Sequence, residues 1–358
     1  MRFYTQPHGF YCGVDLHART LSLCILDQVG HTRLEKTIPA EGPTFLDTIA
    51  PFRDDLVVCC ECLFCWYWLA DLCHEQDVAF VLGHALYMKA IHGGKSKNDR
   101  IDAAKIARLL RGGTIPYGYV YPKGMRETRD LLRRRTYLVH KRAEVITHLQ
   151  NTNSQYNLPP FGKKLVYAAN RDELNIAERF TDPSVRKTVE TDLALIEAYD
   201  PLISELELYL TRTAKVDDPQ AYARLLSIPG VGKVLALVLL YEMHDVSRFA
   251  SAGQFLSYSR LVRCAHESAG KKKGSGPMKI GNAHLRWAFA EAAALFVRQS
   301  PRAKQWMQRQ EKKHGKGRAL AILAARLGRT VYHLLRKGEV FDENRFWGNR
   351  ERVPAAAR

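Results

Sequence analysis

Four carboxylates constrain the fold of this chain more than any other feature of its sequence. They are Asp15, Glu61, Asp99 and Asp102. The first two each end a run of apolar residues, and the last two open a helix-like stretch. Burying even a neutral polar group without a partner costs about 2–7 kcal/mol, so carboxylates at the ends of buried strands need a partner. A divalent cation suits them, because Mg²⁺ prefers hard oxygen ligands.

The residues around these carboxylates predict an antiparallel meander followed by alternating strands and helices. Strands are expected at residues 10–17, 20–27, 31–37, 56–61 and 78–82, and helices at 43–52, 65–76 and 99–111. The run 56–61 is nearly all apolar, which is typical of a strand covered on both faces. This order of elements is that of an α/β ribonuclease H-like fold.

In a ribonuclease H-like site, acids from the first strand, the fourth strand and a later helix meet at one edge of the sheet. There they hold two cations about 3.5–4 Å apart. Each acid also has a structural explanation of its own. Asp99 and Asp102 could form a capping box, Asp15 could end a strand in a turn, and Glu61 could be an exposed strand terminus. Their joint order on the predicted elements favours the metal site.

Beyond Pro122 the sequence predicts a pair of long helices and then a compact helical domain. Residues 125–156 and 185–213 repeat apolar residues at coiled-coil spacing, which favours an antiparallel helical pair. Pro201 argues against one continuous second helix, and Asp200 could cap a new one. The expected domains are residues 1–122, 123–215 and 216–345, followed by a loose tail at 346–358.

The formal net charge of +17 and the pI near 9.5 predict a polyanionic partner, either nucleic acid or an anionic membrane. Apolar runs such as Val234 to Tyr241 are far shorter than the roughly 20 residues that a membrane span needs. The first residues contain no signal-peptide pattern. We therefore expect a cytoplasmic protein with no membrane partner. An acidic metal site in so basic a chain indicates chemistry on phosphodiesters.

Seven of the eight cysteines lie within the first 73 residues, which is typical of small buried side chains in a reducing compartment. Cys62 and Cys65, with Cys59, Cys60 and His74 nearby, could form half of a zinc site. The sequence has no separate Cys-x-x-Cys outside this cluster and no His-x-x-x-His pair to complete it, so buried thiols are favoured.

Glycine-containing segments in the second domain indicate phosphate contacts. Residues 226–236 read as a helix, a Pro-Gly-x-Gly turn and a helix, and such a helix-hairpin-helix points backbone N–H groups at a phosphate. A plain αα-hairpin is the alternative. Residues 260–282 combine glycines, lysines and serines, and their composition alone favours a basic loop over a serine nucleophile. Two last helices, expected at 302–310 and 317–336, add many Lys and Arg side chains.

Several short motifs then follow one another in a specific order. They are Gly13-Val14-Asp15, the strand-ending Glu61, Asp99-x-x-Asp102-Ala103, Ile228-Pro229-Gly230-Val231-Gly232, Glu267-Ser268-Ala269-Gly270 and Gly281-Asn282-x-x-Leu285-Arg286. With these motifs the chain resembles the DEDD transposases of bacterial insertion sequences, relatives of the Piv-type DNA invertases. The resemblance covers nearly the whole chain, about residues 10–340.

The resemblance implies a RuvC-like N-terminal domain, a coiled-coil connector and a mainly α-helical C-terminal transposase domain. It implies that Asp15, Glu61, Asp99 and Asp102 bind Mg²⁺, with two ions expected, and that Ser268 is the nucleophile. Nucleic-acid contacts are expected at Gly230, Gly232, Lys233, Lys271, Lys272, Lys273, Lys279 and Arg286. The implied partners are donor and target DNA, a structured guide RNA (the bridge RNA) and further copies of the chain in a dimer or tetramer. The implied location is the bacterial nucleoid.

Two departures from the family pattern affect this site. The segment Cys62-Leu63-Phe64-Cys65 follows Glu61 where the family usually has a small residue, Thr or Ser, and Gly. Ala269 follows the serine where Gly is frequent, which leaves Ser275 as an alternative nucleophile. The predicted function is DNA recombination through a phosphoserine–DNA intermediate. A metal-dependent junction nuclease that uses water, and a non-catalytic nucleic-acid-binding protein, are the alternatives.

Overall fold

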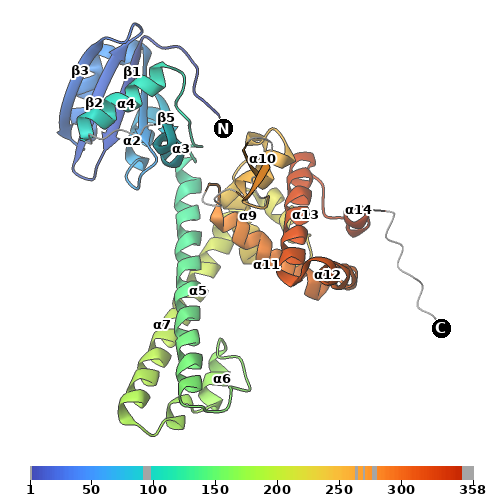
Figure 1. Cartoon of the computed structure of the whole chain (residues 1–358). Helices are drawn as coiled ribbons and strands as arrows, with labels where there is room; N and C mark the ends of the chain where they lie inside the picture. Colours follow the sequence, from blue (N-terminus) through green and yellow to red (C-terminus); the bar gives the residue numbers. More distant parts are fainter. Residues whose placement is uncertain (1, 92–97, 263–264, 269–270, 276–279, 349–358) are drawn as a thin grey trace. The chain divides into compact units, whose positions relative to one another are not determined.

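The computed structural model describes all residues except 1, 92–97, 263–264, 269–270, 276–279 and 349–358. The chain divides into two compact units, Met1–Lys123 and Gly124–Arg358 (Figure 1). The first unit combines a sheet with helices, and the second is mainly helical. Among the described helices, none is long and apolar enough to cross a lipid bilayer.

The first unit is built on a five-stranded sheet with the strand order β3-β2-β1-β4-β5. Its strands are β1 (Phe10–Leu16), β2 (Thr20–Asp27), β3 (Thr32–Pro39), β4 (Leu56–Glu61) and β5 (Ala79–Gly83). The first three pair in antiparallel fashion, whereas β1, β4 and β5 are parallel. All five predicted strands are confirmed, and their order is compatible with the predicted ribonuclease H-like fold.

Helices cover both faces of this sheet. Residues of α1 (Gly42–Ile49) and α2 (Tyr67–Glu75) share a buried cluster with Val14 and Cys60 on one face. On the other face, α4 (Asp99–Arg111) packs its apolar side chains against Val57 and Cys59. Because side chains alternate along a strand, Gly13 faces α4. The helix lies so close there that only glycine fits, as a Cβ at this position would be 2.2 Å from the Ala103 carbonyl oxygen.

Two helical elements of the first unit differ from the prediction. The helix expected at 43–52 ends at Ile49 and is followed by a 3₁₀-helix, η1 (Ala50–Asp55), with Pro51 in its first turn. The sequence does not predict α3 (Ala85–Ile91), because seven residues are too short to display a helical period. The helix predicted at 99–111 forms with those bounds.

Two long helices, α5 (Lys123–Gln155) and α7 (Pro183–Asp217), begin the second unit, with α6 (Ala168–Glu173) and η2 (Ile176–Arg179) between them. Ion pairs join Arg135 to Glu207, Arg142 to Asp200 and His148 to Asp192, so the two helices run antiparallel as predicted. Leu132 of α5 and Leu210 of α7 belong to the core of the C-terminal helices.

The helix α7 is continuous through Pro201, and the predicted break at this position is wrong. Asp200 does not cap a new helix, because its carboxylate accepts hydrogen bonds from Arg142 and Arg171. Arg171 is itself buried and also donates to the Leu165 carbonyl oxygen. These tertiary contacts hold the helix across the hydrogen bond that proline removes.

The helix α9 (Lys233–Met243) is buried on nearly all sides and forms the centre of the C-terminal core. The other helices are α8 (Pro219–Leu226), η3 (Val246–Arg248), α10 (Ala252–Tyr258), α11 (Ala283–Gln299), α12 (Pro301–His314), α13 (Lys316–Lys337) and α14 (Glu343–Trp347). Between α10 and α11 the chain forms a hairpin of β6 (Ala265–Ser268) and β7 (Lys271–Ser275). We call these two strands the serine hairpin.

The end of the described chain also differs from the prediction. Phe346 and Trp347, which the sequence places in a loose tail, are buried in α14. Trp347 stacks on Phe296 with ring centroids 6.0 Å apart, and Phe346 packs edge-on against the same ring at 5.4 Å. The C-terminal core therefore extends to Trp347.

Candidate functional site

Asp15 and Glu61 lie at the carboxyl ends of two adjacent parallel strands, β1 and β4. Val14 pairs with Cys60 in the register of these strands, so the residues that follow them, Asp15 and Glu61, are level with each other. Val14 and Cys60 point into the core beneath α1 and α2. By alternation, Asp15 and Glu61 point to the opposite face, which α4 covers.

Asp99 and Asp102 occupy the first turn of α4, at the same edge of that face. Asn98 is the N-cap residue, and its side chain accepts a hydrogen bond from the amide of Ile101 at 2.8 Å. Asp99 is therefore not the capping residue, and the capping-box explanation of the two acids is wrong. Asp102 forms an ion pair with Lys105 at 3.0 Å, one turn further along the helix.

The structure brings Asp15 and Asp99 together with a third side chain, His17. One ligand atom of each residue lies within 4.8 Å of the other two, so this group could hold a metal ion. His17 Nε2 is 3.4 Å from Asp15 Oδ2 and 3.6 Å from Asp99 Oδ1. Asp15 is only 8% exposed, whereas the other two side chains are at least half exposed, so a cation can reach the group from solvent.

His17 is absent from the residues that sequence reasoning selects. The signal was present, because Asp15 and His17 are two residues apart and side chains two apart on a strand share a face. His17 follows the last residue of β1, and its amide donates to the Thr20 carbonyl oxygen at 2.9 Å in the turn to β2. The turn therefore places the imidazole beside the carboxylates.

Burial raises the pKa of Asp15 above its ordinary value, and His17 opposes this shift while the carboxylates of Asp99 and Asp102 add to it. A bound cation would stabilise the ionised form of such a carboxylate. Two carboxylates and an imidazole fit a divalent metal. Glu61 and Asp102 are not members of the group whose ligand atoms lie within 4.8 Å of one another, although Asp102 is near enough to raise the pKa of Asp15. The four predicted carboxylates thus share one face and one edge of the sheet.

The segment after Glu61 carries the two cysteines with zinc-like spacing. Cys62 is exposed, and Cys65 is half-buried with its Sγ donating to the Leu16 carbonyl oxygen at 3.3 Å. Within the described ranges, these thiols meet no third side chain that could complete a zinc site. The contact to Leu16 instead ties this segment to the end of β1.

Ser268 is the last residue of β6 and pairs with Lys271, the first residue of β7. The segment that composition marks as a passive loop therefore contains a short hairpin. Lys271 is exposed. The side chains of Ser268, Lys272, Lys273 and Ser275, and the whole of Lys279, lie outside the described part of the structure. Their roles stay predictions.

Three nucleic-acid contacts are predicted at the glycine turn between α8 and α9, and the structure buries one of them and exposes the other two. Gly230 is buried, and its amide donates to Gln299 Oε1 at 2.7 Å. A Cβ on Gly230 would lie 2.4 Å from the Phe296 amide nitrogen, so this glycine serves the packing of α11. Gly232 and Lys233 are exposed at the first turn of α9, where a phosphate could approach.

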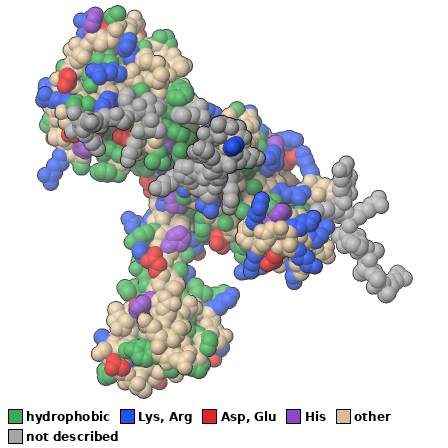
Figure 2. Space-filling view, in the orientation of Figure 1, with side chains coloured by type: hydrophobic (Ala, Val, Ile, Leu, Met, Phe, Trp, Pro, Cys, Tyr) green, Lys and Arg blue, Asp and Glu red, His purple; other side chains and the backbone are tan. Residues whose placement is uncertain are grey.

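Exposed cations concentrate on α12 and α13. They are Lys304, Arg309, Lys312, Lys313, Lys316, Arg318, Arg329, Arg336 and Lys337. Figure 2 shows Lys and Arg side chains gathered over this part of the second unit. Gly315 lies between the two helices and Gly317 in the first turn of α13, both with open space around them, so a nucleic-acid backbone could come close to the main chain there. Arg286 of α11 is also exposed.

Known proteins match this chain along most of its length. The model of the Transposase IS116/IS110/IS902 family matches residues 222–308, and a transposase model of the IS110 DEDD type matches residues 12–157. A transposase for insertion sequence element IS1111A from Coxiella burnetii is 23% identical over 334 residues, covering 92% of this chain and 90% of that protein. A transposase for insertion sequence element IS1328 from Yersinia enterocolitica is 23% identical over 349 residues, covering 94% of this chain and 100% of that protein.

Proposed function

The chain belongs to the IS110-type DEDD transposases of insertion sequences, enzymes that cut and rejoin DNA, and we propose that it does so with a Mg²⁺ centre and a serine nucleophile. Asp15, Glu61, Asp99 and Asp102 would hold the metal, and His17 would either join them or orient two of their carboxylates. When bound, the metal would supply Lewis-acid chemistry to the phosphodiester.

Ser268 Oγ is the proposed nucleophile. It attacks the scissile phosphorus, the bond from phosphorus to the 3′ oxygen breaks, and the serine proton ends on that oxygen as a 3′-hydroxyl is released. The phosphoserine ester keeps the free energy of the phosphodiester. A hydroxyl of the partner DNA then attacks the ester, rejoins the strand and returns the proton to Ser268. No ATP is consumed, in agreement with a sequence that lacks a P-loop motif.

The observation that carries the metal part of this proposal is the meeting of Asp15, His17 and Asp99 within 4.8 Å. A protein that only binds nucleic acid has no need of such a group. Placing a buried carboxylate beside two other acids is unfavourable unless a cation neutralises them. The arrangement therefore favours an enzyme over the non-catalytic alternative.

Denaturing gel electrophoresis of the protein with labelled donor DNA and Mg²⁺ tests the serine chemistry. The wild type is expected to form a covalent protein–DNA adduct, and Ser268→Ala and Asp15→Asn are expected to abolish it. Ser275→Ala is the matched control and should keep the adduct. Adducts that persist in Ser268→Ala would refute the assignment. Cleavage without any adduct would favour the nuclease that uses water.

We further propose a RuvC-like identity for the first unit, a structured guide RNA as partner, and a dimer or tetramer at the nucleoid as the active form. The net charge of +17 and the exposed cations of α12 and α13 support a large nucleic-acid surface. Sequencing of RNA that copurifies with the protein at low salt tests the RNA partner. We expect enrichment of a transcript from the non-coding end of the element, and its absence would count against guidance.

A further inference from the structure

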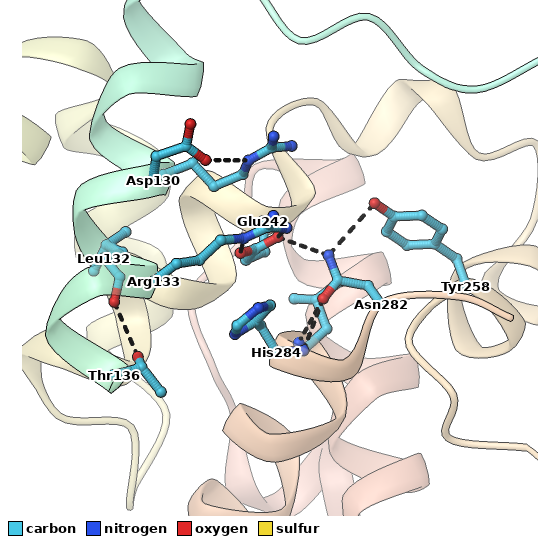
Figure 3. Close-up of polar contacts among 10 residues, drawn as sticks. Asp130, Leu132, Arg133, Thr136, Glu242, Tyr258, Asn282 and His284 are labelled. Atoms are coloured by element: carbon cyan, nitrogen blue, oxygen red, sulfur yellow. Dashed lines mark hydrogen bonds and ion pairs between the residues drawn. The ribbon is translucent and has the colours of Figure 1, made fainter. Parts of the chain in front are cut away.

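Glu242 is a fully buried carboxylate for which the proposed chemistry has no use. It is 1% exposed and lies near the end of α9. Arg133 of α5 donates to both of its oxygens, from Nε to Oε1 at 2.6 Å and from Nη2 to Oε2 at 2.8 Å. Asn282 Nδ2 donates to Oε2 at 2.7 Å (Figure 3). Glu242 thus joins α5 and α9 to the start of α11.

Asn282 connects this network to the serine hairpin. Its Oδ1 caps α11 by accepting hydrogen bonds from the amides of His284 and Leu285. The backbone N–H of Asn282 donates to the Tyr258 carbonyl oxygen at 2.6 Å. Arg260 Nε donates to the Gly281 carbonyl oxygen at 2.9 Å. Residues 258–260 and 281–282 flank the segment that contains β6 and β7, so these bonds close its base.

The backbone at this base has little freedom. Gly281 has a φ of +99°, and a Cβ there would lie 2.6 Å from the Tyr258 carbonyl oxygen. Arg260 has a φ of 54°, which is uncommon for a residue with a side chain. The conformation of Arg260 persists only where the surrounding structure determines it. The bonds from Arg133 to Glu242 and from Glu242 to Asn282 supply part of that surrounding structure.

We infer that Glu242 is a positioning residue for the serine hairpin, because it fixes Asn282 and thereby the base of the segment that contains β6 and Ser268. The inference rests on the proposed role of Ser268. Glu242 is buried while the Arg133 side chain is 37% exposed. Apolar side chains often replace such an ion pair without loss of stability, so stability is not its only role. A role in fixing the position of a reacting group does account for the pair, since a displacement of about 1 Å can cost about 10²-fold in rate.

Three variants separate positioning from simple loss of structure. Glu242→Gln removes the charge at nearly constant shape. The double variant Arg133→Met/Glu242→Leu replaces the pair with apolar side chains and serves if the single variant does not fold. Glu207→Gln is the matched control, because Glu207 accepts from Arg135 of the same helix α5 but joins it to α7.

Two measurements are made on the full chain. Hydrogen exchange is followed by mass spectrometry in peptides covering residues 261–281, and adduct formation is followed under single-turnover conditions. We expect a folded Glu242 variant to exchange at least about tenfold faster in these peptides and to form adduct about 10²-fold more slowly, with a DNA affinity within about twofold of wild type. Glu207→Gln should match the wild type in both.

Unchanged exchange or an unchanged rate in a folded Glu242 variant would overturn the inference, and so would equal losses in Glu207→Gln. Exchange also separates this inference from the proposed function. If the wild type cuts DNA without an adduct, the role of Ser268 fails, whereas faster exchange confined to residues 261–281 still supports Glu242 as the residue that positions the hairpin.

Discussion

Gly13 decides how closely α4 lies on the sheet. A Cβ on this residue would be 2.2 Å from the Ala103 carbonyl oxygen and 2.4 Å from the Ala107 amide nitrogen. Asp99 and Asp102 sit on the first turn of the same helix, while Asp15 is two residues after Gly13 on the strand. Any side chain at position 13 would move the helix and separate the carboxylates. The proposed metal centre therefore depends on the absence of a side chain at position 13.

We predict that Gly13→Ala lowers the free energy of unfolding by about 1–3 kcal/mol, the usual cost of overpacking, and weakens Mn²⁺ binding. Chemical denaturation and electron paramagnetic resonance titration with Mn²⁺ measure the two effects. Gly42→Ala is the control in the same unit, because a Cβ there would meet only the Leu72 side chain, at ordinary distances of 3.4 and 3.9 Å. Wild-type stability and Mn²⁺ affinity in Gly13→Ala would contradict the packing argument.

The raised pKa of Asp15 gives a prediction with a definite sign. Burial is the largest cause of the raised pKa. His17 lowers the pKa, whereas Asp99 and Asp102 raise it further. The ionised carboxylate therefore destabilises the metal-free fold at neutral pH, and this penalty disappears as the pH falls below the ordinary value of 3.8. Asp15→Asn should raise the free energy of unfolding at pH 7 without metal and remove the stabilisation by Mn²⁺. Thermal unfolding with and without Mn²⁺ measures both, and a less stable metal-free variant would contradict the assignment.

Among the secondary-structure elements, α5 and α9 are joined by a charge pair that should respond to acid. Burial alone would raise the pKa of Glu242, but the hydrogen bonds and charge of Arg133, helped by Asn282 and His284, lower it below its ordinary value of 4.5. The ionised form thus contributes stability that is complete above pH 4.5 and is lost as the pH falls through the lowered pKa. The stability difference between wild type and Glu242→Gln should shrink over that range in denaturant titrations. A difference independent of pH would exclude this role.

The last turn of α12 carries two exposed lysines, Lys312 and Lys313, that test the proposed nucleic-acid surface. Each phosphate contact contributes about 0.9 to the slope of log affinity against log salt, so Lys312→Gln/Lys313→Gln should lower that slope by about 2. Lys163→Gln/Lys187→Gln, which changes two exposed lysines elsewhere in the second unit, is the control. Fluorescence anisotropy on duplex DNA at several salt concentrations gives the slopes. Equal slopes in both double variants would remove α12 from the nucleic-acid surface.

The sequence predicts features that depend on local patterns, and it does not predict features that depend on contacts between distant residues. The strands and α4 are predictable, because alternation, apolar runs and helical spacing are local signals. The cap is not, since the sequence alone points to Asp99 where the structure has Asn98. The same signals place the four carboxylates on the right elements. The role of Gly230 is not predictable, because its partner Gln299 is 69 residues away. The continuity of α7 at Pro201 likewise depends on Arg142 and Arg171, which no local pattern brings to Asp200.

Taken as a whole, the molecule has separate hydrophobic cores in its two units. We therefore predict two transitions in differential scanning calorimetry. Mn²⁺ at about 100 times its dissociation constant should stabilise the transition of the first unit by about 2.7 kcal/mol and leave the other unchanged. Glu242→Gln should shift only the transition of the second unit. A single transition that responds to both changes would show that the units unfold together.

The burial of α14 has a practical consequence for anyone who shortens or tags this protein. Phe346 and Trp347 fill space beside Phe296, and Arg326 lies over both of their rings at 4.7 and 4.8 Å. A stop codon placed before Glu343 would strip two aromatic rings from the core and should yield insoluble material. A fluorescent reporter or affinity handle attached after Gly348 leaves those rings in place and should be tolerated.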